Sequence, residues 1–111
     1  MDTDSWQAQL RKGAAEFVVL ALIEKAEAYG LQILNEANRA GSLVAEGALY
    51  PLLNRLERDG KIVSRWSLDQ GAAHPRKYYR LSPAGGRLVT EMRSVWIVFR
   101  TAITAVVEQP T

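Results

Sequence analysis

Six basic residues crowd the stretch from residue 61 to residue 87, where Asp69 is the only acid. The local balance is 6 − 1 = +5, although the whole chain carries a formal net charge of only +2. A concentrated positive patch favours an anionic partner, and the phosphates of double-stranded DNA are the leading candidate. The six basic residues are Lys61, Arg65, Arg76, Lys77, Arg80 and Arg87.

A helical segment with two opposite faces comes just before this patch. In "ALYPLLNRLERDGKI", from residue 48 to residue 62, leucines recur at i, i+3, i+4 and i+7, which is the spacing of one buried helix face. At 100° per residue, Asn54 and Arg58 fall on the opposite side with Gly47 and Pro51. Asn can bind adenine through a donor and an acceptor, and Arg can bind guanine or phosphate. This face predicts a helix that enters a DNA groove, although any surface helix carries such residues.

Pro51 bears on where this helix begins. A proline lacks the N–H that a helix interior uses, and its ring clashes with the preceding turn. It is tolerated in the first turn, where that N–H has no intrahelical partner. We therefore expect the helix to start just before Pro51 and to end at Gly60.

Catalytic and metal-binding chemistry has few candidates. The chain has no cysteine, and His74 is its only histidine, so the residues do not support a metal site or a Ser-His catalytic pair. The acidic pair Glu57 and Asp59 lies near a helix end, and we interpret both as solvated charges. The sequence therefore predicts no enzyme, no metal and no cofactor.

The elements around this helix follow from periodicity and from turn residues. Residues 5–25 read as a helix that is apolar on all sides, typical of a central core helix or of one that also packs on a second subunit. Residues 29–41 predict a short helix that stops at Gly41. Residues 61–68 and 76–81 predict a hairpin whose tip holds His74, and Ser82 begins a last helix that reaches about Glu108.

The last helix is more apolar than one core requires. An apolar stripe runs along it from Leu88 to Val106, and Trp96, Ile97 and Val98 widen that stripe. The extra width predicts packing against a partner subunit, and Trp6 on the inner stripe of the first helix has the same role available. The candidate residues for a dimer interface or a ligand site are Trp6, Leu10, Met92, Trp96, Phe99 and Ile103.

The order of elements predicts a mainly α (α+β) fold, a winged helix-turn-helix with a two-stranded β-wing and a long C-terminal dimerisation helix. Residues 1–81 would form the DNA-binding region and residues 82–111 the dimerisation helix, within one structural domain. The longest apolar run, "FVVLALI", is too short to cross a bilayer, which needs about 20 residues. With no cysteine and no secretory signal, we expect a cytoplasmic protein without a membrane partner.

Four motifs together resemble the PadR family of bacterial transcriptional regulators. They are "YGLQIL" at 29–34, "EGALYPLLNRLERDGKI" at 46–62, "PRKYYRLSPAGGR" at 75–87, and Trp96 well inside the final helix. The resemblance extends from Leu10 to about Phe99. Ala48 departs from it, because the family often has Thr there, and the change could remove a hydroxyl contact to phosphate.

The resemblance implies the small PadR type, in which one C-terminal helix is exchanged across a homodimer. In some members that resemble this chain, paired tryptophans near the dimer axis flank a site for flat aromatic ligands. We expect a repressor that binds a pseudo-palindromic operator, and Trp96 with the wide apolar helix motivates the hypothesis that an effector between the subunits releases the DNA. A tryptophan that only anchors the interface is the alternative for Trp96.

The DNA-binding residues expected on this basis come from the amphipathic helix and the wing. The alternatives are a winged-helix module that binds protein through the same face and a ligand-binding protein without DNA function. For Tyr50, packing under the wing is the alternative to a contact with DNA, and for the wing cations it is simple solubility. The expected DNA-binding residues are Tyr50, Asn54, Arg55, Arg58, Lys61, Arg76, Lys77 and Arg80.

Overall fold

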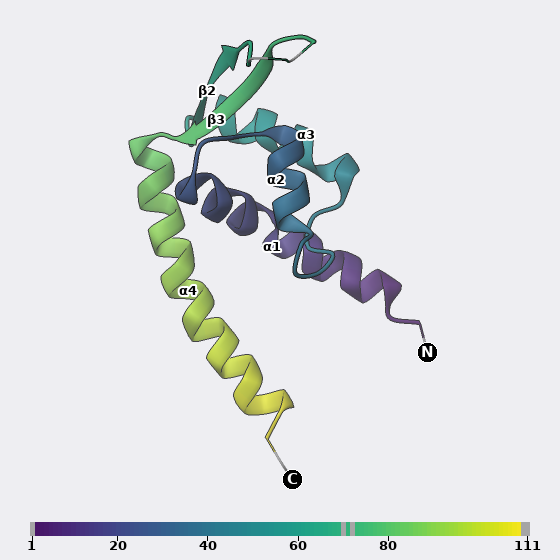
Figure 1. Cartoon of the computed structure of the whole chain (residues 1–111). Coiled ribbons are helices and arrows are strands. Elements are labelled where there is room, and N and C mark those ends of the chain that lie inside the picture. The colour runs from purple at the N-terminus through teal and green to yellow at the C-terminus, as the bar shows by residue number, and fades with distance from the viewer. Residues whose placement is uncertain (1, 70, 72, 110–111) are drawn as a thin grey trace.

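The computed structural model describes residues 2–69, 71 and 73–109, and it contains four helices and three short strands in that part of the chain (Figure 1). The mainly α winged helix-turn-helix expected from the sequence is confirmed, with α2 and α3 as the helix-turn-helix pair. In chain order the elements are α1 (Asp4–Lys25), β1 (Ala28–Tyr29), α2 (Gly30–Ala37), α3 (Glu46–Arg58), β2 (Ile62–Ser67), β3 (Arg76–Leu81) and α4 (Pro83–Val107).

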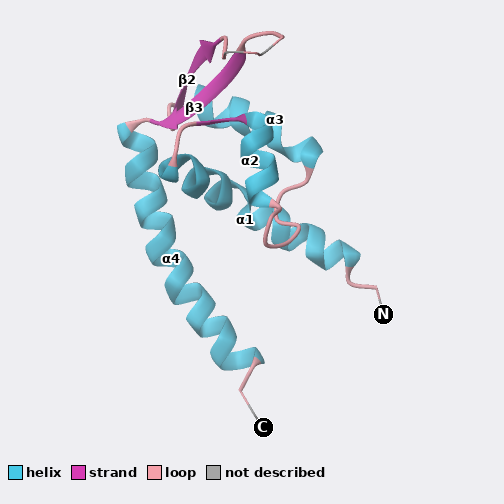
Figure 2. Cartoon of the chain, viewed as in Figure 1, coloured by secondary structure: helices cyan, strands magenta, loops and turns pink. Residues whose placement is uncertain are grey.

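The wing is the antiparallel hairpin of β2 and β3, as predicted (Figure 2). Its register pairs Ser64 with Tyr79 and Arg65 with Tyr78, so Tyr79 is buried on the inner face and Tyr78 lies on the outer face. The sequence did not predict β1, which adds a third strand in the order β1-β3-β2. Two residues are too few to show an alternating pattern, so β1 exists only because β3 offers it a free edge.

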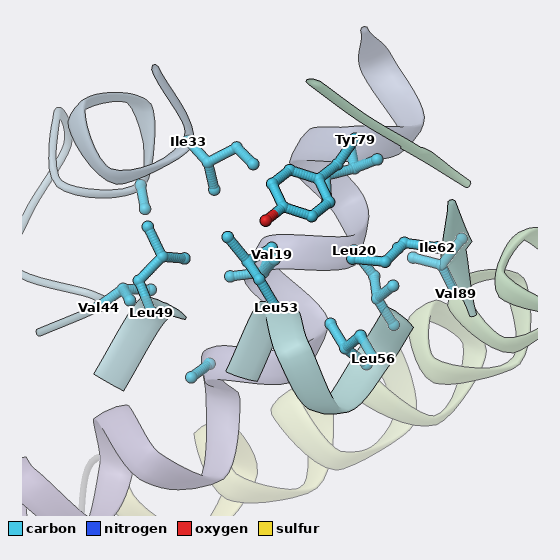
Figure 3. Packing of buried hydrophobic residues seen from close by; sticks show 13 residues of the cluster. Val19, Leu20, Ile33, Val44, Leu49, Leu53, Leu56, Ile62, Tyr79 and Val89 are labelled. Carbon is cyan, nitrogen blue, oxygen red and sulfur yellow. The ribbon is translucent and has the colours of Figure 1, made fainter. Parts of the chain in front are cut away.

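One hydrophobic core joins α1, α2, α3, the sheet and the start of α4 (Figure 3). Leu49, Leu53 and Leu56 of α3 are fully buried, as their spacing predicted. The expectation of a central core helix holds for the second half of α1 only, where Val19 and Leu20 are fully buried. The first half of α1 is largely exposed.

Helix α2 ends at Ala37, so the predicted end at Gly41 is wrong. The cause is Asn38, whose amide Nδ2 donates to the carbonyls of Leu34 (3.1 Å) and Val44 (2.9 Å). Its Oδ1 also accepts from the backbone N–H groups of Leu43 and Val44. One side chain thus closes the helix and shapes the loop that leads to α3, because it satisfies backbone groups that would otherwise lack partners.

Helix α3 begins at Glu46, so the expectation that it starts just before Pro51 is also wrong. Pro51 lies in the second turn, and the hydrogen bond it forfeits would have gone to the carbonyl of Gly47. Gly47 and Pro51 are both exposed, so water can hydrate that carbonyl and the loss is small.

Helix α4 starts as predicted, with Ser82 as its N-cap and Pro83 in the first turn. The Ser82 hydroxyl accepts from the Gly85 backbone N–H at 3.0 Å. The side chain that reaches the core is Val89, which is fully buried, whereas Met92 on the predicted stripe is only partly buried.

The distal half of α4 extends away from the rest of the molecule (Figure 1). The radius of gyration is 16.1 Å, compared with about 13 Å for a compact domain of this length. The longest axis measures 57 Å and the shortest 22 Å. A chain with one core is elongated here because half of its longest helix has no cover from its own protomer.

Candidate nucleic-acid interface

The outward face of α3 is free, with the wing on one side of it and α1 on the other. Gly47, Pro51, Asn54 and Arg58 are all exposed, on the side of α3 opposite the buried leucines. This arrangement is the one that the helical projection predicted. An amphipathic helix held by its apolar side, with a smooth start and polar groups beyond it, can enter a DNA major groove.

A three-residue contact joins α3 to the wing. The Lys77 ammonium on β3 lies 2.9 Å from the Glu57 carboxylate on α3, and the Ser64 hydroxyl on β2 donates to the same carboxylate. The hydrogen bonds from Ser64 and Lys77 lower the pKa of Glu57, and the Glu57 carboxylate raises the pKa of Lys77. We call Glu57, Ser64 and Lys77 the wing clamp.

The wing clamp corrects the interpretation of Glu57 as a solvated charge. Glu57 follows the buried Leu56 at the edge of the apolar face, a position that turns a side chain toward a neighbouring element. The sequence signal for this contact was therefore the position of Glu57 beside the apolar stripe of α3, and not the fact that it is a glutamate. The clamp also turns Lys77 toward α3, so Lys77 would have to leave Glu57 before it could bind a phosphate.

The outer face of the wing carries a second cluster of cations and aromatic rings. Arg65 donates to the carboxylate of Glu27 at 2.5 and 3.0 Å and lies 4.9 Å above the centre of the Tyr78 ring. Arg76 lies 4.5 Å above the ring of Tyr29 and 3.5 Å from Asp69. The Tyr78 hydroxyl also bonds to Asp69, which raises the pKa of Tyr78. These guanidinium groups are held in place yet remain half-exposed, so they can still face an anion.

The other predicted cations differ in whether an acidic side chain lies close to them. Arg80 is exposed and has no acidic group within 4 Å in the described part of the chain. Arg55 lies 3.4 Å from Glu16 of α1, and Arg58 lies 3.9 Å from Asp59. Each of these pairs is at least one-third exposed, and exposed pairs of this kind are worth about 1 kcal/mol or less, so a phosphate can replace the carboxylate.

Lys61 has a structural function through its backbone. Its carbonyl accepts from the Ser82 backbone N–H at 3.1 Å, and a Cβ at Gly85 would come within 1.9 Å of the same oxygen. The start of α4 therefore packs closely against the turn that follows α3.

Tyr50 packs against the start of α2 and is still 49% exposed. A Cβ at Gly30 would lie 2.6 to 2.9 Å from atoms of the Tyr50 ring, so the glycine of "YGLQIL" makes room for that ring. Tyr50 also lines a pocket of about 440 Å³ under the wing, together with Trp66, His74 and Lys77. Tyr50 therefore has the packing role that was the alternative to a DNA contact, and about half of its surface stays accessible to a partner.

The expected interface residues form an apolar surface along α4 and the start of α1. The Trp96 ring lies 6.4 Å from the ring of Phe17 and remains 41% exposed, and Met92 packs against the core. Trp6, Leu10, Phe99 and Ile103 are all exposed. Hence Trp6 does not face the core of its own protomer, contrary to the inner stripe assigned to it.

Two other classes of site have no support in the described residues. No group of three or more His, Asp or Glu side chains is arranged there to hold a metal ion. Of the helices that the structure describes, none combines the length and apolarity needed to cross a bilayer.

Comparisons with known proteins agree on one family. The family described as "Transcriptional regulator PadR-like family" matches residues 19–91. A Mycobacterium tuberculosis protein named transcriptional regulator Rv3488 is 36% identical over 85 residues, which are 77% of this chain and 78% of that protein.

Two solved structures are similar over nearly their whole length. A PadR family transcriptional regulator from Eggerthella lenta has a TM-score of 0.82 and 30% identity, covering 97% of this chain and 94% of its own. A PadR-like transcriptional regulator from Bacillus cereus has a TM-score of 0.82 and 27% identity, covering 92% and 99%. With its free recognition helix, basic wing and these relatives, the chain belongs to the PadR-like family of DNA-binding transcriptional regulators and is not an enzyme.

Proposed function

We propose that two copies of the chain join through the apolar surface of α4 and repress transcription from a pseudo-palindromic operator. The observation that carries this proposal is the free outward face of α3, held between the wing and α1. A homodimer would place two such helices in successive major grooves about 34 Å apart. Residues 1–81 then bind DNA and residues 82–111 form the dimer, in the cytoplasm where the DNA is.

The DNA-binding residues divide by the kind of contact each can make. Asn54 and Arg58 lie on the outward face of α3 and would contact base edges. Tyr50 beside them would place its hydroxyl on a phosphate or a base. Arg55, Lys61, Arg76, Lys77 and Arg80 would bind phosphates, with Lys77 exchanging Glu57 for DNA.

The test is DNA binding measured over a range of salt concentrations, with duplexes selected from fragmented genomic DNA. We expect log K to fall steeply and linearly with log salt. Arg76→Ala should weaken binding to all sequences and make the slope shallower by about 1 per lost contact, whereas Asn54→Ala should change which sequences are preferred. Salt-insensitive capture of a protein, with no DNA bound, would instead favour an interaction module.

A ligand response is a second part of the proposal. Trp96 is partly exposed on the proposed dimer surface and touches Phe17, so a flat aromatic molecule between the subunits could stack there. The contact between Gly85 and the Lys61 carbonyl would carry the resulting shift of α4 to α3. Unchanged tryptophan fluorescence and DNA affinity across a panel of aromatic ligands would leave Trp96 with a purely structural role.

A further inference from the structure

The first half of α1 has two faces of opposite character. Trp6 and Leu10 lie on one side of the helix, on the apolar surface described above. At 100° per residue, Arg11 and Lys12 point to the opposite side. The sequence assigned no role to these two cations, and the apolar surface leaves them free of the proposed dimer interface.

The basic side of α1 lines a groove of about 720 Å³ against the outward side of α3. The groove holds Arg11, Lys12, Arg55 and Arg58, and Glu16 is the only acid among its lining residues, so its charge is 4 − 1 = +3. Glu16 is already paired with Arg55 at 3.4 Å. A basic groove with its acid neutralised attracts an anion rather than a second cationic surface.

Arg11 and Lys12 are available for such an anion. Neither has an acidic group within 4 Å in the described part of the chain, whereas Arg55 contacts both Glu16 and Asp59. Small residues line the groove beside them, including Ala8, Ala45 and Ala48, so a bulky polyanion can approach the protein backbone closely.

The groove also lies where a second DNA strand would run. Tyr50 and Glu57 of α3 border the wing, while Ala48 and Arg55 border α1, so the wing and α1 flank the outward face on opposite sides. A helix in a major groove about 12 Å wide has one phosphate backbone on each side. The wing accounts for one backbone, and on the other side the residues expected from the sequence are Arg55 and Arg58 of α3 itself, with none from α1.

We infer that the groove between α1 and α3 holds the sugar-phosphate backbone on the side of α3 opposite the wing, with Arg11 and Lys12 as its phosphate contacts. The inference rests on the proposed function, because it requires α3 to lie in the major groove. Contacts of this kind fix the register of α3 on the duplex without reading the sequence.

The experiment compares Lys12→Ala with Lys25→Ala on operator DNA across a salt series. Both substitutions remove one positive charge from α1. The two lysines lie about 20 Å apart along the helix axis and point in nearly opposite directions, so the variants differ only in where the charge is lost. For Lys12→Ala we expect affinity to fall about tenfold and the salt slope to become shallower by about 1 per protomer, equally for all sequences. Lys25→Ala should leave both values unchanged.

Arg11→Ala combined with Lys12→Ala should double the change in slope, and Lys12→Glu should weaken binding further than Lys12→Ala. Circular dichroism and sedimentation check that each variant is folded and retains the oligomeric state of the wild type. Equal effects of the Lys12 and Lys25 variants, an unchanged slope in the double variant, or a changed oligomeric state would each overturn the inference. If the wild type itself binds no DNA, the proposed function fails, which is a different result.

Discussion

The second half of α4 is richer in apolar residues than the first half, yet it is the half without cover from its own protomer. In the first half, Gly85 and Val89 are buried against the turn after α3 and against the core. In the second half, Val95 is 68% exposed and Phe99 is 58% exposed. Apolar spacing in a sequence thus shows which side chains need cover, but it does not show which chain provides the cover.

The largest effect should come from placing the same charge on each half. Val89→Asp buries an unpaired carboxylate, so we expect the free energy of unfolding to fall by about 4 kcal/mol. Val95→Asp is the matched comparison, because its side chain reaches water within the protomer: it should weaken the proposed dimer and leave the protomer folded, so both variants are compared at concentrations where the protein is monomeric. Urea unfolding followed by circular dichroism measures both variants. Equal losses would mean that the second half is not free in the protomer.

A pair of neighbouring glycines tests the contact at the start of α4. A Cβ at Gly85 would come within 1.9 Å of the Lys61 carbonyl, so Gly85→Ala should cost about 2 kcal/mol. At Gly86 a Cβ has nothing within 4 Å, so Gly86→Ala should stabilise the helix by about 1 kcal/mol. Opposite shifts in thermal midpoint are therefore expected. Stabilisation by both substitutions would show that α4 does not press on the Lys61 turn.

Truncation in the second half should affect assembly and leave the fold unchanged. Phe99→Ala removes a large ring from the proposed dimer surface, and we expect the dimer dissociation constant to rise about tenfold, or about 1.4 kcal/mol. Sedimentation at several concentrations measures this constant. Arg100→Ala, on the neighbouring position, serves as a control for general changes in the helix. A variant that unfolds while it remains dimeric would contradict the division between the halves.

The smallest effect concerns the wing clamp, which belongs to the covered part of the molecule. The pKa of Glu57 is lowered in the folded state, so its contribution is present above the unfolded pKa and is lost as pH falls through the folded pKa. Glu57→Gln should remove that part of the acid sensitivity and cost about 1 kcal/mol at neutral pH. Unfolding midpoints between pH 7 and pH 3 provide the measurement, with Glu36→Gln as an exposed control. Identical pH profiles for wild type and Glu57→Gln would rule the clamp out.

Much of the fold was predictable because its signals are local. The spacing of Leu49, Leu53 and Leu56 predicted the buried side of α3, and Ser82 with Pro83 predicted the start of α4. The hairpin followed from its β-branched and aromatic residues. Each of these features depends on residues within one or two helical turns or within one strand. Such local patterns can be recognised in the sequence without knowledge of the tertiary structure.

The predictions failed where a side chain or strand depends on a partner from another segment of the chain. Asn38 ended α2 early because it bonds to the loop beyond it, and β1 exists because β3 has a free edge. Glu57 is clamped because the wing brings Ser64 and Lys77 to it. No periodicity within a segment encodes such pairings.

The order of residues alone was enough to recognise the family, the kind of fold and the residue types of a DNA-binding helix and wing. Only the tertiary structure decided which cations are already paired, which remain free, and that Arg11 and Lys12 share a groove with α3. The physical reason is that helix and strand periodicities depend on near neighbours, whereas the charge of a surface depends on which elements fold against one another.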